Sequence, residues 1–245
     1  MRKKYNYGFY EDLGKAREGT NTVARIVYEK IMEVYDVCSI VDFGCGIGTW
    51  LSTFKQINQQ GIILGIDGDW ISDDQLLIDK TCFLRANLNQ EIKLEKKYDL
   101  AQSLEVAEHL PKSRAYSFVK DLTDASDLVL FSAAIPGQGG IEHVNEQWLS
   151  YWVEIFRGYD YELFDVIRTQ LWNRDDIKEL HYKQNIVLFA RKGTKSYDAC
   201  SRIRMGEPIC DIVHPDIYMD QISFKQTRVY KIALKISRVL SGMRI

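Results

Sequence analysis

The chain has 245 residues, of which 46% are hydrophobic, and this length suffices for a large core in one domain, with or without an appendage. Its 32 Lys and Arg residues against 34 Asp and Glu leave a formal net charge of -2, so no overall positive field draws the chain to nucleic acid. A charged ligand must therefore be bound by a local site.

Cysteine usage and the amino-terminal residues bear on the compartment. The cysteines are odd in number and include no CxxC pair, which disfavours a disulfide framework and a zinc site. Residues 1–15 are basic but lack the apolar core of a signal peptide, and no apolar run approaches the roughly 20 residues needed to cross a bilayer. We therefore predict a cytoplasmic protein with reduced thiols at Cys38, Cys45, Cys82, Cys200 and Cys210.

The first half of the chain alternates between helical patterns and short apolar strands. Apolar residues from Thr20 to Tyr35 recur at helical spacing, which predicts an amphipathic helix. Helical patterns return in TWLSTFKQI (49–57) and RAYSFVKDL (114–122). The predicted strands are SIVDF (39–43), GIILGID (61–67), CFLRANL (82–88), YDLAQSL (98–104) and DLVLFSAA (127–134).

This alternation predicts an α/β fold in which a mostly parallel sheet has helices on both faces. Two further strands, 159–168 and 185–192, complete an expected seven-stranded sheet whose last strand is antiparallel. Residues 193–223 show no regular period, and helical spacing returns in 225–240. We accordingly predict one domain over residues 1–192, with 1–35 as an N-terminal lid and helix, and a C-terminal extension over 193–245.

A glycine-rich stretch, IVDFGCGIGTWL (40–51), joins the first strand to the helix that follows it. After Asp42 it has glycines at alternate positions, which let the backbone approach a ligand, and the helix start adds free N–H donors. A tight turn, a dinucleotide loop and a methyl-donor loop are all open at this point. Asp67, at the end of the next strand, favours a nucleoside because an acid there can bind a ribose diol.

The spacing GxGxG resembles motif I of the class I S-adenosylmethionine-dependent methyltransferases, and Asp67 matches that family's ribose-binding acid. ANL (86–88) stands where the family usually has Asp against the adenine, and SLEVAEHLP (103–111) resembles its segment beside the methionine moiety. The resemblance covers residues 35–192 and implies a Rossmann-like methyltransferase fold, S-adenosylmethionine as cofactor and S-adenosylhomocysteine as product. The cofactor-binding residues it implies are Asp42, Gly44, Gly46, Gly48, Trp50, Asp67, Gly68, Asn87, Leu88, Ser103 and Leu104.

The segment SAAIPGQGGIEHVNEQWLSYW (132–152) leaves the carboxyl end of the fifth strand, where an active site is expected. Methyl transfer to a hydroxyl requires removal of a proton, a role that suits a neutral imidazole. His143 is therefore predicted as the general base, with His109 as its rival and Glu108 in reach to orient either ring. A purely structural role for each histidine is the alternative.

Further residues are predicted to contact the substrate, and Tyr10 belongs with Tyr5 and Tyr7 to a segment that the family often lays over the cofactor. No metal is predicted: Glu142, Glu146 and Asp160 could assist a magnesium ion, but no ligand spacing demands one. His181 and His214 are expected outside the mouth of the site. The predicted substrate-binding residues are Gln138, Asn145, Glu146, Gln147 and Tyr10.

The stretches 41–51, 103–111 and 132–152 also resemble a methyltransferase subgroup of bacterial capsule, surface-polysaccharide and glycan biosynthesis. This implies an O-methyltransferase that acts on a hydroxyl of a sugar or a nucleotide-activated sugar. One alternative is a same-fold enzyme that methylates a nitrogen, a phosphoryl-type oxygen or a small metabolite. The other is a non-catalytic partner protein that binds the cofactor. No nucleic-acid partner is expected.

The C-terminal tail is basic, with no acid after Asp220. Val229, Ile232, Ile236 and Val239 recur on one helical face, so the helix could lie peripherally on an anionic membrane or hold a partner, and a homodimer is compatible with the sequence. Docking of this helix on its own domain is the alternative. The basic residues are Lys225, Arg228, Lys231, Lys235, Arg238 and Arg244.

Overall fold

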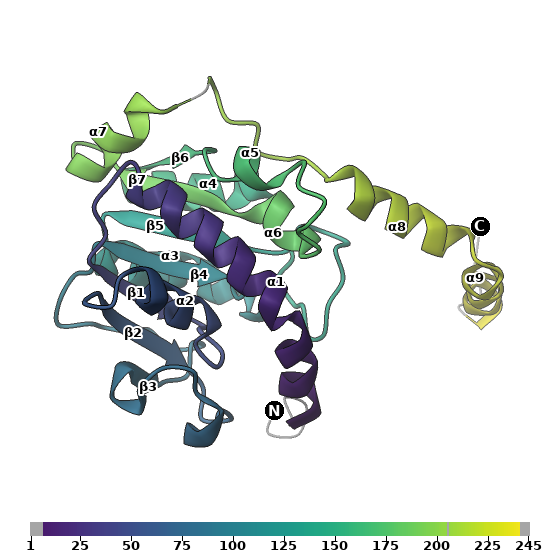
Figure 1. Ribbon diagram of the computed structural model, residues 1–245. Coiled ribbons are helices and arrows are strands. Elements are labelled where there is room, and N and C mark those ends of the chain that lie inside the picture. The colour runs from purple at the N-terminus through teal and green to yellow at the C-terminus, as the bar shows by residue number, and fades with distance from the viewer. Residues whose placement is uncertain (1–6, 205, 241–245) are drawn as a thin grey trace. The chain divides into compact units, whose positions relative to one another are not determined.

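The computed structural model describes residues 7–204 and 206–240 (Figure 1). By its contacts the chain divides into two compact units, Met1–Asp211 and Ile212–Ile245. The first unit holds the sheet. The second contains two helices, α8 (Pro215–Gln226) and α9 (Arg228–Leu240). The predicted domain boundary after Lys192 stays a prediction.

The first unit is built on a seven-stranded sheet with the order β3-β2-β1-β4-β5-β7-β6. β7 pairs antiparallel with β5 and with β6, and the other pairs are parallel, which confirms the predicted mixed sheet. The chain runs outward from β1 in both directions, so a crevice forms beside β1 and β4 at their carboxyl ends. The strands are β1 Ser39–Phe43, β2 Ile62–Asp67, β3 Phe83–Arg85, β4 Leu100–Leu104, β5 Leu128–Ser132, β6 Tyr161–Phe164 and β7 Val187–Arg191.

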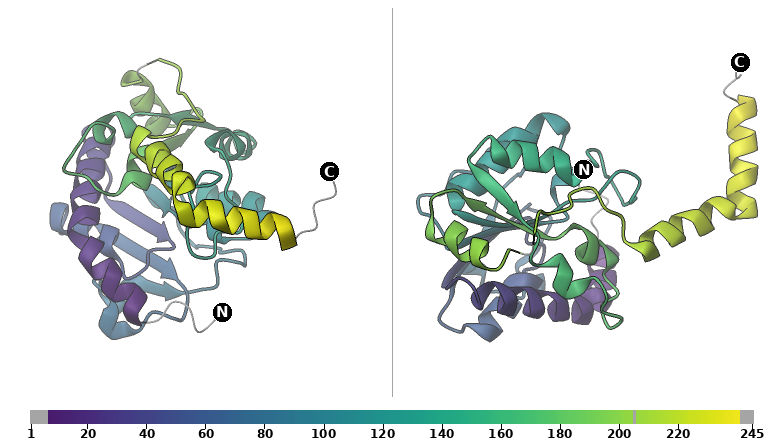
Figure 2. Two further views of the ribbon diagram at one scale, coloured as in Figure 1. Left: turned by 90° about the vertical axis from the view of Figure 1, so that its right-hand side faces the viewer. Right: turned by 90° about the horizontal axis from the view of Figure 1, so that it is seen from above.

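Helices cover both faces of the sheet, with α1 and α2 on one side and α3 and α4 on the other (Figure 2). Strand residues alternate between the two resulting cores. In β5, Leu128 and Leu130 pack with the α1 side, whereas Val129 and Phe131 pack with the α3 side. The helices of this unit are α1 Tyr7–Met32, α2 Thr49–Ile57, α3 Ala115–Ala125, α4 Leu149–Arg157, α5 Arg168–Leu171, α6 Leu180–Asn185 and α7 Lys195–Arg202.

Several elements differ from the predicted ones. Helix α1 begins at Tyr7 rather than near Thr20, because its first turns lack the apolar period that reveals a helix in sequence. The third strand ends at Arg85, since the Asn87 side chain accepts a hydrogen bond from the Asn89 N–H and starts a turn. Helix α7 and most of helix α8 form within residues 193–223, where no element was predicted.

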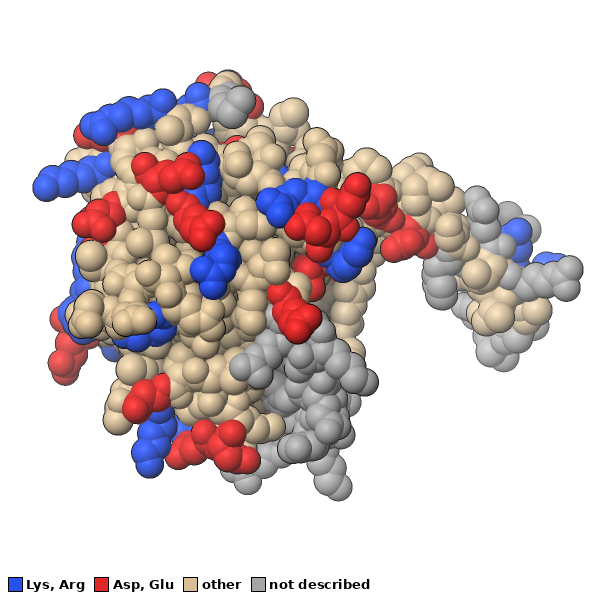
Figure 3. Space-filling model, viewed as in Figure 1, with Lys and Arg blue, Asp and Glu red and all other residues tan. Residues whose placement is uncertain are grey.

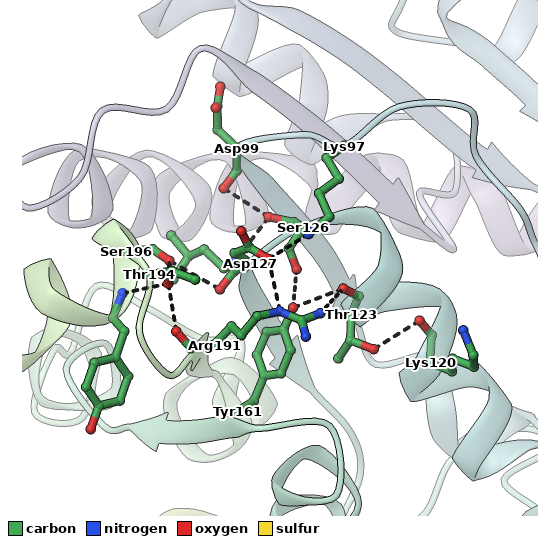
Figure 4. Close-up of polar contacts among 12 residues, drawn as sticks. Lys97, Asp99, Lys120, Thr123, Ser126, Asp127, Tyr161, Arg191, Thr194 and Ser196 are labelled. Atoms are coloured by element: carbon green, nitrogen blue, oxygen red, sulfur yellow. Dashed lines mark hydrogen bonds and ion pairs between the residues drawn. The ribbon is translucent and has the colours of Figure 1, made fainter.

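Polar contacts tie β5, β6 and β7 together at the amino end of β5 (Figure 4). Arg191 donates to the Asp127 carboxylate at 3.0 Å and to the Thr123 carbonyl at 2.8 Å. The Tyr161 hydroxyl donates to the carbonyls of Thr123 and Ser126. These contacts fix the edge opposite the carboxyl ends of the parallel strands, where ligands of such sheets bind.

The surface of the described residues is electrically mixed. On the face seen in Figure 3, Lys and Arg are interspersed with Asp and Glu, as the formal net charge of -2 leads one to expect. Among residues 7–204 and 206–240, no helix has the length and apolar character needed to cross a bilayer.

Candidate functional site

A cleft of about 930 Å³ opens at the carboxyl ends of β1, β2 and β4. This is the position that the strand order predicts for a ligand. Glu108, His143, Gly48, Gly68 and Ser103 are not part of its lining. The predicted site residues that do line it are Asp42, Gly44, Gly46, Trp50, Asp67, Asn87, Leu88, Leu104 and His109.

The glycine loop between β1 and α2 has a backbone that only glycine adopts easily. Gly44, Gly46 and Gly48 have φ values of 87°, 56° and 86°. At Gly44 a Cβ atom would also lie 2.4 Å from Val106, whereas at Gly46 it would meet nothing within 4 Å. The loop therefore needs glycine for its conformation, and at Gly44 also for contact with the segment after β4.

Asp67 closes this loop from the end of β2. Its carboxylate accepts hydrogen bonds from the backbone N–H groups of Gly46 and Gly68, each at 2.7 Å. Burial raises the pKa of Asp67, and the two N–H groups counteract that rise. The side chain lines the cleft, so a carboxylate is held at a defined position beside the loop.

Asp42 connects the loop to the interior of the sheet. Its carboxylate accepts a 2.7 Å hydrogen bond from Gln102 of β4, and the Gln102 oxygen accepts one of 2.8 Å from the Tyr28 hydroxyl. Burial raises the pKa of Asp42 to about 7, against the lowering effect of the Gln102 bond, and the nearby Asp67 raises it further. An acid that is about half protonated at pH 7 therefore lies under the loop.

The other two predicted cofactor segments differ in exposure. Asn87 is exposed and its side-chain oxygen is engaged by Asn89, so the amide that it can offer a ligand is a donor. Leu88 and Leu104 are buried apolar parts of the lining. Ser103 is fully buried and does not line the cleft, and its hydroxyl has no hydrogen-bond partner among the described residues.

One wall of the cleft is aromatic. The Trp50 indole N–H donates to the Tyr182 hydroxyl at 3.2 Å, and the two rings meet edge to face at 5.3 Å. Sequence reasoning missed Tyr182 because it belongs to α6, more than 130 positions after the loop. His181, expected outside the mouth, lines the cleft beside it, and Trp70 lines it as well.

Glu105, just after β4, was also missed as an individual site residue. It has a φ of 55°, in the left-handed region that costs a non-glycine residue about 1–2 kcal/mol. Its carboxylate accepts hydrogen bonds from Gln138 at 2.9 Å and from Asn185 at 3.1 Å. Asn185 also donates to the Gln138 oxygen at 2.9 Å. Three distant segments are thus joined at the cleft, because Glu105 lines it.

The predicted catalytic residues do come together. The His109 and His143 rings meet edge to face with centroids 4.8 Å apart, and His143 Nε2 lies 4.0 Å from Glu108 Oε1. His109 lines the cleft, whereas His143 lies behind it between Glu142 and Val144, which both line it. Burial and the nearby His143 lower the pKa of His109, so its ring is neutral at pH 7.

The predicted substrate-binding residues mainly hold their own loop together. Glu146 accepts hydrogen bonds from the N–H groups of Gly137 at 2.7 Å and Gly139 at 3.0 Å. Asn145 is buried and accepts one from Gln147 at 3.0 Å. Gln138, Asn145, Glu146 and Gln147 do not line the cleft. Tyr5 lies outside the described residues, and so do the side chains of Tyr7 and Tyr10.

The three acids considered for magnesium do not form a group. Glu142 lines the cleft, but Asp160 immediately precedes β6 and so lies at the opposite edge of the sheet. Glu146 is occupied by the two glycine N–H groups and His143. His214, expected away from the mouth, belongs to the second compact unit.

The chain matches no protein-family model and no curated protein sequence. It is similar to the solved structure of the plantazolicin methyltransferase BpumL in complex with SAH, with 13% identity over 76% of this chain and 89% of that one, and a TM-score of 0.52. It is also similar to the small RNA methyltransferase HEN1, with 16% identity over 76% of this chain and 26% of that one, and a TM-score of 0.51. These similarities confirm the Rossmann-like methyltransferase fold.

Proposed function

We propose that this chain is an S-adenosylmethionine-dependent O-methyltransferase that acts on a hydroxyl of a sugar or a nucleotide-activated sugar. The observation that carries the proposal is the Asp67 carboxylate, held at the end of β2 beside the Gly46 N–H and facing the cleft. A ribose diol donates two hydrogen bonds to a carboxylate at this position in nucleoside-binding sheets of this kind.

The rest of the cleft suits the other parts of the same cofactor. The adenine fits beside Leu88, where the Asn87 amide can donate to a ring nitrogen. The methionine portion then runs over the glycine loop toward Leu104, and the small residues of that loop let it approach the backbone. This direction brings the sulfonium methyl group toward His109.

The reaction is a displacement at the methyl carbon. The acceptor hydroxyl oxygen forms a bond to that carbon while the carbon–sulfur bond breaks, which yields a methyl ether, S-adenosylhomocysteine and one proton. Positioning supplies most of the rate of such a transfer. The proton is released next to the pair His109 and His143, of which His109 faces the cleft. We therefore propose His109 or, through it, His143 as the proton acceptor.

The acceptor class rests on the resemblance to glycan-modifying methyltransferases and on the polar residues near His109. Glu105, Lys112 and Glu142 all line this end of the cleft and could hydrogen-bond several hydroxyls.

Two experiments on the full chain test the cofactor and acceptor separately. Calorimetry should give binding of S-adenosylmethionine and S-adenosylhomocysteine and weaker binding of NAD, and tighter binding of NAD would overturn the cofactor. Release of S-adenosylhomocysteine should then be screened with sugar nucleotides and polysaccharide precursors, and with RNA and peptides for comparison. Activity with another class alone would reject the sugar and leave the cofactor intact. Binding without transfer to any acceptor would favour the non-catalytic alternative.

We also propose that α9 contacts an anionic membrane surface. Val229 and Ile232 are 77% and 57% exposed on it, and Lys231 and Lys235 are exposed too. Of the other residues predicted for this surface, Arg244 and the side chains of Lys225, Arg228, Ile236, Arg238 and Val239 lie outside the described part. Deleting residues 224–245 should abolish co-sedimentation with anionic liposomes, and unchanged sedimentation would remove the idea.

A further inference from the structure

Three potential metal ligands converge behind the cleft. Glu108 and His109 belong to the turn after β4, and His143 comes from the loop that leads to α4. One ligand atom from each lies within 4.8 Å of the other two. The two segments are held in register because the Glu108 carbonyl accepts the N–H groups of Val144 and Asn145, each at 2.9 Å. The convergence is therefore built into the backbone.

The polar atoms of this cluster lack normal hydrogen-bond partners. Glu108 is completely buried, and within the described residues neither carboxylate oxygen makes a hydrogen bond of standard geometry. The same holds for the buried Nδ1 of His109. Burial raises the pKa of Glu108 well above its usual value, as do Glu105 and Glu146, despite the lowering effect of nearby backbone N–H groups. An unpaired carboxyl in the interior is costly unless a cation or donor satisfies it.

His143 is already oriented as a metal ligand would be. Its Nδ1 lies 2.9 Å from Glu146 Oε1, which leaves Nε2 facing Glu108. Glu146 is itself fixed by the N–H groups of Gly137 and Gly139. Metal-binding histidines usually donate their other ring N–H to a carboxylate, which sets the tautomer and the direction of the ring.

We propose that Glu108, His109 and His143 bind one divalent first-row transition-metal ion, with Glu146 as the residue that positions His143. Two imidazoles and one carboxylate form a donor set suited to ions such as Zn²⁺ or Mn²⁺, whereas Mg²⁺ prefers oxygen ligands. Ligands at about 2.0–2.2 Å from a tetrahedral ion lie roughly 3.4 Å apart. His143 Nε2 and Glu108 Oε1 now lie 4.0 Å apart and all three ligand atoms lie within 4.8 Å of one another, so the side chains must draw together by roughly 1 Å to bind the ion.

The role of this ion rests on the proposed methyl transfer. His109 lines the cleft, so an ion bound to its ring is within reach of the acceptor hydroxyl. Coordination lowers the pKa of a bound hydroxyl, so that its proton passes to solvent water before or as the oxygen attacks the methyl carbon. The carbon–sulfur bond breaks in the same step, and the electron pair stays on the sulfur of S-adenosylhomocysteine. In this route, which replaces proton transfer to His109 or His143, the two imidazoles hold the ion and do not take up the proton.

Metal binding is tested directly on chelator-treated full-length protein, titrated with MnCl₂ and followed by the electron paramagnetic resonance of free Mn²⁺, and with ZnCl₂ by calorimetry. We expect one ion per chain and weaker binding of MgCl₂. Glu108→Gln and His143→Ala should each weaken binding more than about 100-fold, and Glu146→Gln by about 10- to 100-fold. His181→Ala, which removes a cleft histidine outside the cluster, should leave metal binding unchanged.

Saturation only above about 1 mM, or equal affinity in wild type and the Glu108 and His143 variants, would overturn the site. Circular dichroism checks that each variant folds, and Glu146→Gln provides a milder test if Glu108→Gln does not. Binding of S-adenosylhomocysteine is measured separately. Metal binding without methyl transfer would reject the proposed function and leave the metal site standing, whereas methyl transfer that survives complete metal removal would reject the role of the ion.

Discussion

The glycine loop after β1 and the polar cluster of Glu108, His109 and His143 lie at the same cleft, but they differ in how far their polar groups are hydrogen-bonded. In the glycine loop, the Asp67 carboxylate accepts two backbone hydrogen bonds, so it has hydrogen-bond partners without a ligand. In the polar cluster, both oxygens of Glu108 and the Nδ1 of His109 make no standard hydrogen bond to the described residues. A ligand can therefore bind to the loop as it stands, whereas the cluster needs a further partner to satisfy it.

The largest effect is expected at Asp67, the residue proposed to bind the ribose. Asp67→Ala removes two charge-assisted hydrogen bonds, each worth about 1.5–3 kcal/mol, so the affinity for S-adenosylhomocysteine should fall at least about 100-fold. Calorimetry measures this directly. Asp69→Ala, an exposed acid two positions on, is the matched control and should change the affinity little. A loss below threefold for Asp67→Ala would mean that the loop side does not hold the ribose.

Gly44→Ala tests the contact between the two regions. The added methyl group would lie 2.4 Å from Val106 at a φ of 87°, so left-handed backbone costs about 1–2 kcal/mol and overpacking about 1–3 kcal/mol more. Gly46 has a positive φ too, but its Cβ would meet nothing, so Gly46→Ala should lower the free energy of unfolding only by the backbone cost of about 1–2 kcal/mol. Urea unfolding measures both, and Val106→Ala should restore part of the loss in Gly44→Ala. Equal losses at both glycines would contradict a close approach of the two segments.

The same contrast explains what could be predicted. The loop side is local: strand, glycines and Asp67 stand within 30 residues, and their spacing alone placed them correctly at one edge of the sheet. The parallel part of the sheet followed from the alternation of strands and helices, and the antiparallel β7 from the break in that alternation near the end of the domain. On this side the groups proposed to bind the ligand are backbone groups of the loop and Asp67, and the spacing of the glycines is enough to locate them.

The cluster side depends on long-range contacts that no spacing reveals. Glu105 meets Gln138 and Asn185, which are 33 and 80 positions away. His143 was predicted at the active site, but its ring is turned toward Glu108 and Glu146 by contacts that only the folded loop creates. Glu146 was predicted to bind substrate because it is polar and near the mouth, and its bonds to Gly137 and Gly139 could not be read from the sequence.

Asp42, which connects the glycine loop to Gln102 inside the sheet, predicts a pH dependence. The folded chain keeps the Asp42 proton to about pH 7, whereas the unfolded chain releases it near pH 3.9. The free energy of unfolding should therefore fall by as much as about 4 kcal/mol as pH rises from about 4 to about 7. Asn at this position keeps the Gln102 bond and carries no charge, so Asp42→Asn should match wild type at pH 4 and exceed it at pH 8. Urea unfolding across this range measures it, and parallel pH profiles would contradict a buried, protonated Asp42.

The smallest effect is expected at Asn185, whose hydrogen bonds to Glu105 and Gln138 hold the segments beside the polar cluster. Asn185 is 5% exposed, donates to both Glu105 and Gln138 and accepts from Gln184 at 3.0 Å. Asn185→Ala leaves these partners incompletely bonded, at a cost of about 1–3 kcal/mol in the free energy of unfolding, whereas the exposed Asn173→Ala should cost less than about 0.5 kcal/mol. If the hydrogen bonds of Asn185 also fix the positions of the metal ligands, metal affinity should fall in Asn185→Ala, while the affinity for S-adenosylhomocysteine stays close to wild type. Equal stability of Asn185→Ala and Asn173→Ala would mean that Glu105 keeps its positive φ without Asn185. The hydrogen bonds of Asn185 would then contribute little to the stability of this side of the cleft.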